Sequence, residues 1–334
     1  MAVLVCGGAG YIGSHTVKAL LKRKEEVIVL DNFQQGHTEA VDDGALLYNG
    51  DLRDEAIVEE IFLNHKITSV IHFAANSLVA ESVRNPLSYY DNNLYGTLCL
   101  VKAMNRYGVK QIVFSSTAAV YGDPVSTPIL ETDPTHPTNP YGETKLATEK
   151  MLKWCAAAYN MQYIILRYFN AAGADMGGEI GEDHNPETHL IPLVLQAALR
   201  KREKIMIYGD DYDTRDGTCI RDYIHVDDLA SAHVVALEKL RRNRKSGTYN
   251  LGTEKGFSVK EVIDVARKVT GVNIVAEKAA RRTGDPAVLI ASSAKAKKEL
   301  EWKPKYESLE EIITSAWRWF QKYPEGYKSK SYVQ

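Results

Sequence analysis

Cys6-Gly7-Gly8-Ala9-Gly10-Tyr11-Ile12-Gly13 is the stretch that decides the fold, because it follows an apolar run and opens a helical pattern. Its glycines match the spacing G-x-G-x-x-G and also G-x-x-G-x-x-G. Glycines at such a turn let the backbone approach a pyrophosphate, and the following helix supplies free N–H groups and a positive dipole. The stretch therefore predicts a strand–turn–helix unit that binds a dinucleotide, provided that its surroundings agree.

The N-terminal half surrounds this stretch with short apolar runs that alternate with amphipathic segments. Such alternation predicts βαβ units and a doubly wound parallel sheet covered by helices on both faces. The expected strands are residues 3–6, 27–31, 46–48, 70–74, 111–115 and 163–168. The expected helices are residues 14–24, 55–64, 93–107 and 141–159.

A carboxylate at the end of the second expected strand selects the dinucleotide. Asp31 lies 18 residues beyond Gly13, where it can accept hydrogen bonds from the adenosine ribose and would repel a 2′-phosphate. This favours NAD over NADP. Asp51-Leu52 can cap the adenine, but Asp51 or Asp54 can equally be the N-cap of the next helix. Small residues in Phe73-Ala74-Ala75 suit a ligand at the carboxyl edge of the sheet.

The sequence changes in character after about residue 170. Residues 171–185 are rich in Gly, Asp and Glu and predict a long loop, followed by helices at 190–201, 227–239 and 259–270 and short strands at 205–208 and 248–251. We expect an α/β protein with a Rossmann-type NAD-binding domain over residues 1–171, to which a segment at about 225–252 returns. A smaller mixed α/β domain over residues 172–334 would bind the substrate.

Composition limits the partners. Lys and Arg total 41 against 43 Asp and Glu in 334 residues, without a basic block, which disfavours nucleic acid and membrane surfaces. The four cysteines form no CxxC pair, so neither a disulfide framework nor a metal site is expected. We expect a cytoplasmic protein without a membrane span.

Tyr141 and Lys145 are the predicted catalytic pair. They are four residues apart in a helical run and therefore project from one face. A tyrosine hydroxyl has a pKa near 10, and we expect the Lys145 ammonium and an oxidised nicotinamide to lower it. Thr117 ends an expected strand and is the third predicted member; alternatively, its hydroxyl only bonds its own backbone.

Longer phrases resemble a known family. The glycine stretch, Asp31, Ser115-Ser116-Thr117, the Tyr141/Lys145 pair and residues 221–226 are similar to the extended short-chain dehydrogenase/reductase superfamily. Residues 89–93, 167–173 and 217–223 resemble the UDP-glucose (UDP-galactose) 4-epimerase family within it. The resemblance covers nearly the whole chain.

The resemblance implies a reaction. Tyr141 would remove the proton of the sugar 4-hydroxyl while C4 gives its hydride to NAD. The 4-keto sugar would rotate, and bound NADH would return the hydride to the opposite face, interconverting UDP-galactose and UDP-glucose. The family also implies a homodimer packed through helices around residues 93–107 and 141–159.

Site residues follow from the motifs and the resemblance together. The predicted cofactor residues are Gly7, Gly10, Tyr11, Ile12, Gly13, Asp31, Asn32, Asp51, Leu52, Phe73, Ala74, Ala75, Asn92, Ser115, Tyr141, Lys145 and Tyr168. The predicted substrate residues are Thr117, Tyr141, Phe169, Asn170, His189, Leu190, Tyr208, Arg221, Arg282, Asp285 and Leu289. Arginines suit a diphosphate, an aromatic ring suits uracil, and a carboxylate suits a ribose hydroxyl.

Three positions depart from or vary within the family pattern. Ser77 stands where many relatives carry a lysine that reaches the cofactor pyrophosphate, so affinity would rest on backbone and dipole. His189 replaces an asparagine that touches the nucleotide, which leaves its role open between ligand contact and surface. Leu289 replaces a larger tyrosine and predicts some turnover of UDP-N-acetylglucosamine and UDP-N-acetylgalactosamine, unless it only packs in a short strand.

Rival functions are less consistent with the sequence. A nucleotide-sugar 4,6-dehydratase or decarboxylase needs carboxylates just after the strand-end hydroxyls, where this chain has Ala118-Ala119. A non-catalytic NAD-sensing protein would be expected to lose Tyr141 or Lys145. A net reductase would use the same triad, and it would differ by releasing its dinucleotide in every turnover.

Overall fold

The computed structural model describes residues 1–282 and 285–327, and its larger part is a seven-stranded sheet. Every neighbouring pair is parallel, in the order β11-β6-β5-β4-β1-β2-β3. The strands are β1 (Ala2–Cys6), β2 (Glu26–Asp31), β3 (Leu46–Asn49), β4 (Ile67–His72), β5 (Gln111–Ser115), β6 (Gln162–Arg167) and β11 (Gly247–Asn250). The strand order reverses between β1 and β4, and ligands of such sheets bind at the carboxyl ends beside that point.

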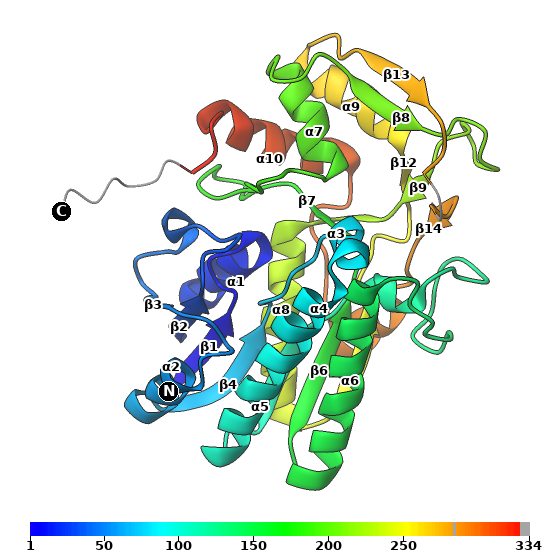
Figure 1. Cartoon of the computed structure of the whole chain (residues 1–334). Helices are drawn as coiled ribbons and strands as arrows, with labels where there is room; N and C mark the ends of the chain where they lie inside the picture. The colour runs from blue at the N-terminus through cyan, green and yellow to red at the C-terminus, as the bar shows by residue number, and fades with distance from the viewer. Residues whose placement is uncertain (283–284, 328–334) are drawn as a thin grey trace.

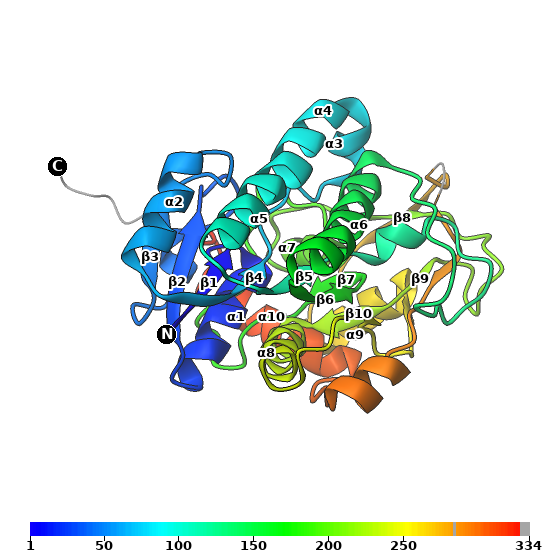
Figure 2. The same cartoon turned by 90° about the horizontal axis from the view of Figure 1, so that it is seen from below.

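Helices cover both faces of this sheet, as the end-on view in Figure 2 shows. One face packs against α1 (Tyr11–Lys22) and α8 (Val226–Asn243), and the other against α2 (Glu55–Asn64), α5 (Gly96–Arg106) and α6 (Pro140–Tyr159). Successive residues of β1 point to opposite faces of the sheet. Val3 and Val5 pack in the core under α1 and α8, and Leu4 and Cys6 pack in the core under α2, α5 and α6. Burial on both sides explains why these strands are continuously apolar.

A smaller part lies above the carboxyl ends of the sheet in Figure 1. Its strands pair as β7 (Asn170–Ala172) with β10 (Tyr223–His225), β8 (Ile205–Tyr208) with β13 (Ala276–Ala279), and β9 (Ile220–Arg221) with β12 (Phe257–Ser258) and β14 (Val288–Leu289). Its core is formed by α7 (Leu190–Ala198), α9 (Val259–Thr270) and α10 (Leu309–Lys322). Two short helices, α3 (Val79–Arg84) and α4 (Pro86–Tyr89), follow β4.

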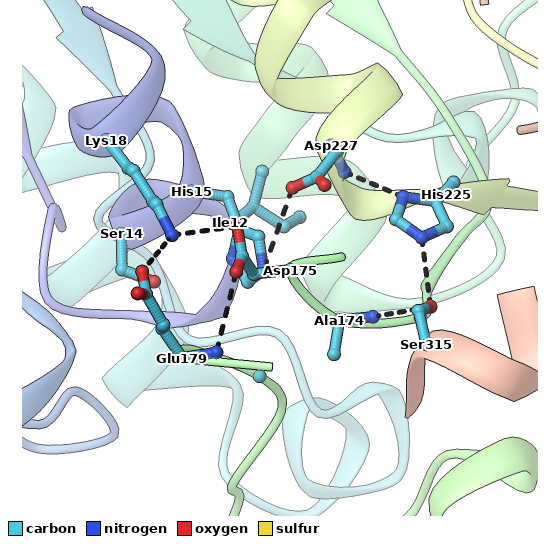
Figure 3. Close-up of polar contacts among 12 residues, drawn as sticks. Ile12, Ser14, His15, Lys18, Ala174, Asp175, Glu179, His225, Asp227 and Ser315 are labelled. Atoms are coloured by element: carbon cyan, nitrogen blue, oxygen red, sulfur yellow. Dashed lines mark hydrogen bonds and ion pairs between the residues drawn. The ribbon is translucent and has the colours of Figure 1, made fainter. Parts of the chain in front are cut away.

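A buried polar network joins α1 to the smaller part (Figure 3). His15 Nε2 in α1 lies 4.0 Å from Asp227 Oδ1 at the start of α8. The Asp227 backbone N–H donates to His225 Nδ1 (3.1 Å), and His225 Nε2 lies 3.0 Å from Ser315 Oγ of α10. Burial, assisted by Asp175, raises the pKa of Asp227 to about 6. Burial lowers the pKa of His15 to about 4.

The predicted α/β fold with a doubly wound parallel sheet is confirmed, with differences at element boundaries. The strand expected over residues 70–74 stops at His72, because the N–H groups of Phe73 and Ala74 both donate to the Cys6 carbonyl (2.8 and 3.0 Å) and the regular ladder ends. The helix expected over 93–107 begins earlier than predicted, as a π-helical segment over Tyr90–Tyr95. It then continues without a break as α5. The division into domains at residue 171 stays a prediction.

Two general findings concern the described residues. Within residues 1–282 and 285–327, no helix combines the length and apolar composition that crossing a membrane requires. All four cysteines are free thiols.

Candidate active site

The turn between β1 and α1 is shaped by close backbone approach. Gly7 has φ +79°, and a Cβ there would lie 2.5 Å from the Ala74 backbone nitrogen. A Cβ at Gly13 would lie 2.0 Å from the Gly7 carbonyl oxygen. Helix α1 follows Gly10, and no side chain caps its first N–H groups. The turn therefore keeps N–H donors available for an anion, which fits the pyrophosphate of a dinucleotide.

Asp31 is the last residue of β2 and lies next to the glycine turn. It is 8% exposed, and its carboxylate accepts the N–H groups of Ala9 and Phe33, both at 2.9 Å. Burial raises the pKa of Asp31, partly opposed by these hydrogen bonds. The carboxylate is thus fixed directly beside the glycine turn.

Asp51 and Asp54 have separate roles in the structure. Asp54 is the N-cap of α2 and accepts the Ala56 N–H at 3.0 Å. Asp51 instead pairs with Arg53 (2.7 Å) and accepts Asn32 Nδ2 (2.9 Å). Arg53 holds the pKa of Asp51 well below its usual range. Asp51 thus lines the cavity with both carboxylate oxygens bonded to Arg53 and one of them also to Asn32, and the N-cap is Asp54.

Helix α6 carries the predicted catalytic pair. It begins at Pro140, and the Asn139 side chain caps it by accepting the Gly142 N–H at 2.9 Å. Proline at the first helical position and Asn before it fix where the helix starts. This start places Tyr141 in the first turn and Lys145 one turn later, on one face.

The two side chains reach the end of β5. Lys145 Nζ donates to the Ser115 carbonyl at 2.9 Å, and the Thr117 hydroxyl, which lies near Tyr141, accepts the Ala119 N–H at 3.1 Å. Burial raises the pKa of Tyr141 to about 12, partly offset by Thr117. Burial lowers the pKa of Lys145 to about 7, partly opposed by Glu149. The expectation that Lys145 and an oxidised nicotinamide together lower the Tyr141 pKa stays a prediction; in this structure the Lys145 ammonium donates to a carbonyl rather than to the tyrosine.

A buried ion pair supports this face of α6. Glu149, one turn beyond Lys145, accepts Ser116 Oγ (2.6 Å) and Arg167 Nε (2.9 Å), and Arg167 Nη1 donates to the Tyr121 hydroxyl (2.9 Å). The pair ties α6 to β5 and β6. This ion pair was not predicted, although Glu149 continues the four-residue spacing of Tyr141 and Lys145.

The remaining predicted residues lie toward the smaller part. Arg221 in β9 pairs with Asp285, and the Arg282 guanidinium lies 4.0 Å from the Tyr208 ring centroid. Leu289 in β14 is in register with Arg221. Elsewhere on this wall, Phe169 and Leu289 pack against one apolar cluster that includes Ala118 and Leu146, and Asn170 Nδ2 donates to the Asp222 carbonyl (3.1 Å).

All predicted site residues line two adjoining cavities. The larger, of about 1060 Å³, is lined by every predicted cofactor and catalytic residue and by all predicted substrate residues except two. Leu190 and Tyr208 line the smaller cavity, of about 250 Å³, which shares His189, Arg221, Arg282 and Asp285 with the larger. Two adjoining cavities therefore extend from the glycine turn to the Tyr208–Arg282 pair.

Several lining residues were not predicted. They include the polar residues Gln35, Arg84, Asn139, His184 and Thr188 and the apolar residues Val79, Ala80 and Val83 of α3. His184 and His189 lie close to Glu182 in the loop before α7. The spacing Glu182-x-His184-x-x-Glu187-x-His189 was a sequence signal that could have identified this loop.

Comparison with known proteins assigns the chain to a family. Residues 3–252 match the family described as NAD dependent epimerase/dehydratase. The UDP-glucose 4-epimerase of Halalkalibacterium halodurans is 62% identical over 331 residues, covering 99% of both chains. The chain belongs to the UDP-glucose 4-epimerase family. It is therefore a member of an NAD-dependent enzyme family.

Solved structures of the UDP-glucose 4-epimerase family have the same fold. A crystal structure of a UDP-glucose 4-epimerase is 56% identical with a TM-score of 0.97, covering 98% of this chain and 100% of the other. The Bifidobacterium longum UDP-glucose 4-epimerase, solved in complex with NAD+ and UDP, is 42% identical with a TM-score of 0.92, covering 98% and 100%.

Proposed function

We propose that this chain interconverts UDP-galactose and UDP-glucose with NAD that stays bound through the cycle. The observation that carries the proposal is the placement of Tyr141 and Thr117 on the cavity that begins at the glycine turn and continues to Arg221 and Tyr208. One space thus has room for a dinucleotide at one end and a nucleotide sugar at the other.

The chain's own part in the chemistry is proton handling at one oxygen. Tyr141 removes the proton of the sugar 4-hydroxyl and gives it back after the 4-keto sugar has rotated. Thr117 shares the hydrogen bond with Tyr141, and Lys145 is anchored on the Ser115 carbonyl at the same wall. When bound, NAD supplies a positive ring that favours the Tyr141 phenolate and takes up and returns the sugar C4 hydride.

Both ends of the cavity have residues of suitable chemistry. Asp31 would bind the adenosine ribose, and Asn32, Asp51 and Leu52 would border the adenine. At the substrate end, Arg221 and Arg282 would bind the diphosphate. Tyr208 would pack against uracil, and Asp285 would accept a ribose hydroxyl. The remaining residues would surround the sugar and the nucleotide: Phe169, Asn170, His189, Leu190 and Leu289. The other predicted cofactor residues line the same cavity and would contact the rest of the dinucleotide.

The dehydratase alternative lacks a proton carrier at the required place. Ala118 and Ala119 follow Thr117 in a short 3₁₀ turn, Ala118–Tyr121, and both line the cavity. Elimination across C5 and C6 needs a carboxylate there. A reductase would share the Tyr141 chemistry, but the relatives at high identity are UDP-glucose 4-epimerases, which favours the epimerase.

The proposal includes the organisation of the protein. We assign residues 1–171, with a returning segment at about 225–252, to the NAD domain and residues 172–334 to the UDP-sugar domain, and we place the enzyme in the cytoplasm as a homodimer. In support of the dimer, Tyr95, Leu98 and Trp154 are exposed on and beside α5 and α6.

The test is an NMR assay of purified protein with UDP-galactose and no added cofactor. We expect UDP-glucose to form and the ratio of the two sugars to reach the same value from either direction. Activity only after NAD is added would mean that cofactor is lost on purification. A 4-keto or reduced product in place of the epimer would overturn the proposal.

A further inference from the structure

The loop between β7 and α7 brings four metal-ligand side chains together. Glu182, His184, Glu187 and His189 each offer one ligand atom, and these atoms all lie within 4.8 Å of one another. Glu182 Oε1 lies 3.2 Å from His184 Nδ1 and also bonds His189 Nδ1. Glu187 Oε2 lies 4.0 Å from His184 Nδ1. The four ligand atoms therefore form one group, in which Glu182 Oε1 is shared between the two histidines.

The backbone that carries the cluster is held from several sides. Trp319 Nε1 of α10 donates to the Glu182 carbonyl at 3.2 Å. The Asp183 carboxylate accepts the Tyr327 N–H at 2.8 Å. The Asp183 carbonyl lies 2.9 Å from His37 Nε2. These contacts come from the smaller part and from the segment after β2, so the loop is fixed before any ligand arrives.

Glu187 is oriented by its own loop. Its Oε1 accepts the N–H groups of Thr188 and His189, at 2.7 and 2.8 Å. This leaves Oε2 as the oxygen directed to the cluster, toward His184. A ligand whose second atom is hydrogen-bonded in this way is positioned for coordination.

We propose that Glu182, His184, Glu187 and His189 bind one divalent transition-metal ion of the Zn²⁺ class. Two imidazoles and two carboxylates suit Zn²⁺, Co²⁺ or Mn²⁺, whereas Mg²⁺ and Ca²⁺ prefer oxygen ligands alone. The two carboxylates supply two negative charges, which a divalent ion balances once it has displaced any imidazole protons. A tetrahedral ion with bonds of about 2.0–2.1 Å holds its ligands about 3.3 Å apart, which small side-chain shifts supply.

The ion would stabilise one wall of the substrate cavity. His184, Thr188 and His189 line that cavity, and the His184 ring packs edge-to-face on Tyr11, 6.2 Å between centroids. The site would thus connect the loop before α7 to the start of α1. This assignment concerns a metal that takes no part in the proposed reaction, so its test does not depend on activity.

The primary experiment is calorimetric titration of untagged, chelator-treated, full-length protein with ZnCl₂ alone. We expect one equivalent of Zn²⁺ per chain and no comparable heat with MgCl₂. Titration with CoCl₂ should give the intense visible absorption of tetrahedral Co²⁺. Absence of stoichiometric Zn²⁺ binding, or Co²⁺ absorption typical of the hydrated ion, would overturn the assignment without touching the proposed function.

Substitutions of two proposed ligands test whether Zn²⁺ binds at this cluster. Glu182→Gln and His184→Asn should each weaken Zn²⁺ binding by at least about tenfold. The matched control is His136→Asn, because His136 is exposed in a different loop, and it should leave Zn²⁺ affinity unchanged. Thermal unfolding with and without Zn²⁺ checks folding: Zn²⁺ should raise the midpoint of the parent and control but not of the site variants. Equal affinity in all four proteins would place the ion elsewhere.

Discussion

The Tyr141 hydroxyl is the group on which the proposed chemistry depends most directly. Tyr141→Phe keeps the ring and removes only the oxygen that carries the proton. We expect kcat for UDP-galactose epimerisation to fall by about 10²–10⁴-fold, the usual worth of a general acid–base group. The measurement is an initial-rate NMR assay on protein with verified NAD content.

The control for this substitution lies on the same helix. Tyr159 ends α6 and is 48% exposed, so Tyr159→Phe should leave kcat unchanged. If Tyr141→Phe kept its NAD and lost less than tenfold in kcat, another group would have to carry the proton.

The proposed role of Leu289 is to set the substrate range through its size. It lines the cavity beside Phe169, and a larger ring there would occupy space next to the sugar. Leu289→Tyr should lower kcat/KM for UDP-N-acetylglucosamine relative to UDP-glucose by an amount equivalent to about 1–3 kcal/mol. Competition kinetics with both sugars measures the ratio. A parent enzyme that already rejects the acetylated sugar several thousandfold would refute this account of Leu289.

Individual residues were predictable where the chemistry is local in sequence. The glycine turn, Asp31 and the Tyr141/Lys145 pair are each defined by spacing along one or two elements. Glu149 and Arg167 meet only because α6 packs against β6, so no single motif contains their pairing. The raised pKa of Tyr141 is also a consequence of burial, which spacing does not report.

The β1–α1 turn depends on Gly13 having no side chain. Gly13→Ala would place a Cβ 2.0 Å from the Gly7 carbonyl, so α1 must shift or the turn must open. We expect the free energy of unfolding to fall by about 1–3 kcal/mol, as for other overpacked sites. We also expect the variant to purify with less bound NAD. Urea unfolding and the cofactor absorbance of the purified protein are the readouts.

Gly96→Ala supplies the comparison, since it makes the same change in α5. A Cβ there would make an ordinary contact of 3.5 Å with Leu52. Helix propensity alone should then stabilise the variant by up to about 1 kcal/mol. Equal stability of the two variants would mean that close approach at Gly13 does not constrain the turn.

Elements were predictable where the apolar period is regular. All six strands expected in the N-terminal half are present, because burial on both faces leaves a continuous apolar run. Helix α10 was not predicted, although Ser308 and Glu311 form a capping box at its start. The π-helical segment before α5 could not be predicted, since one extra residue per turn leaves little trace in the apolar pattern.

The two parts of the protein meet at a largely buried cluster of ionisable and polar side chains. His15, Asp227, His225 and Ser315 connect α1, α8 and α10 (Figure 3). These residues are separated by up to 300 positions in sequence, and the packing of α8 onto α1, together with the contact of α10 at Ser315, brings them together. Stability at this junction should therefore depend on pH in a way that sequence alone does not suggest.

Asp227→Asn tests that dependence. The folded protein holds the Asp227 proton up to a pKa of about 6, whereas an unfolded aspartate releases it near 3.8, so Asp227 costs the folded state stability as pH rises between these values. The variant should match the parent near pH 4 and exceed it above pH 6.5 by about 1–2 kcal/mol, since partial exposure limits the effect. Urea unfolding from pH 4 to 8 measures the difference, and exposed Asp43→Asn should show none. A constant difference across that range would mean that Asp227 titrates alike in both states and that its burial at the junction has no electrostatic cost.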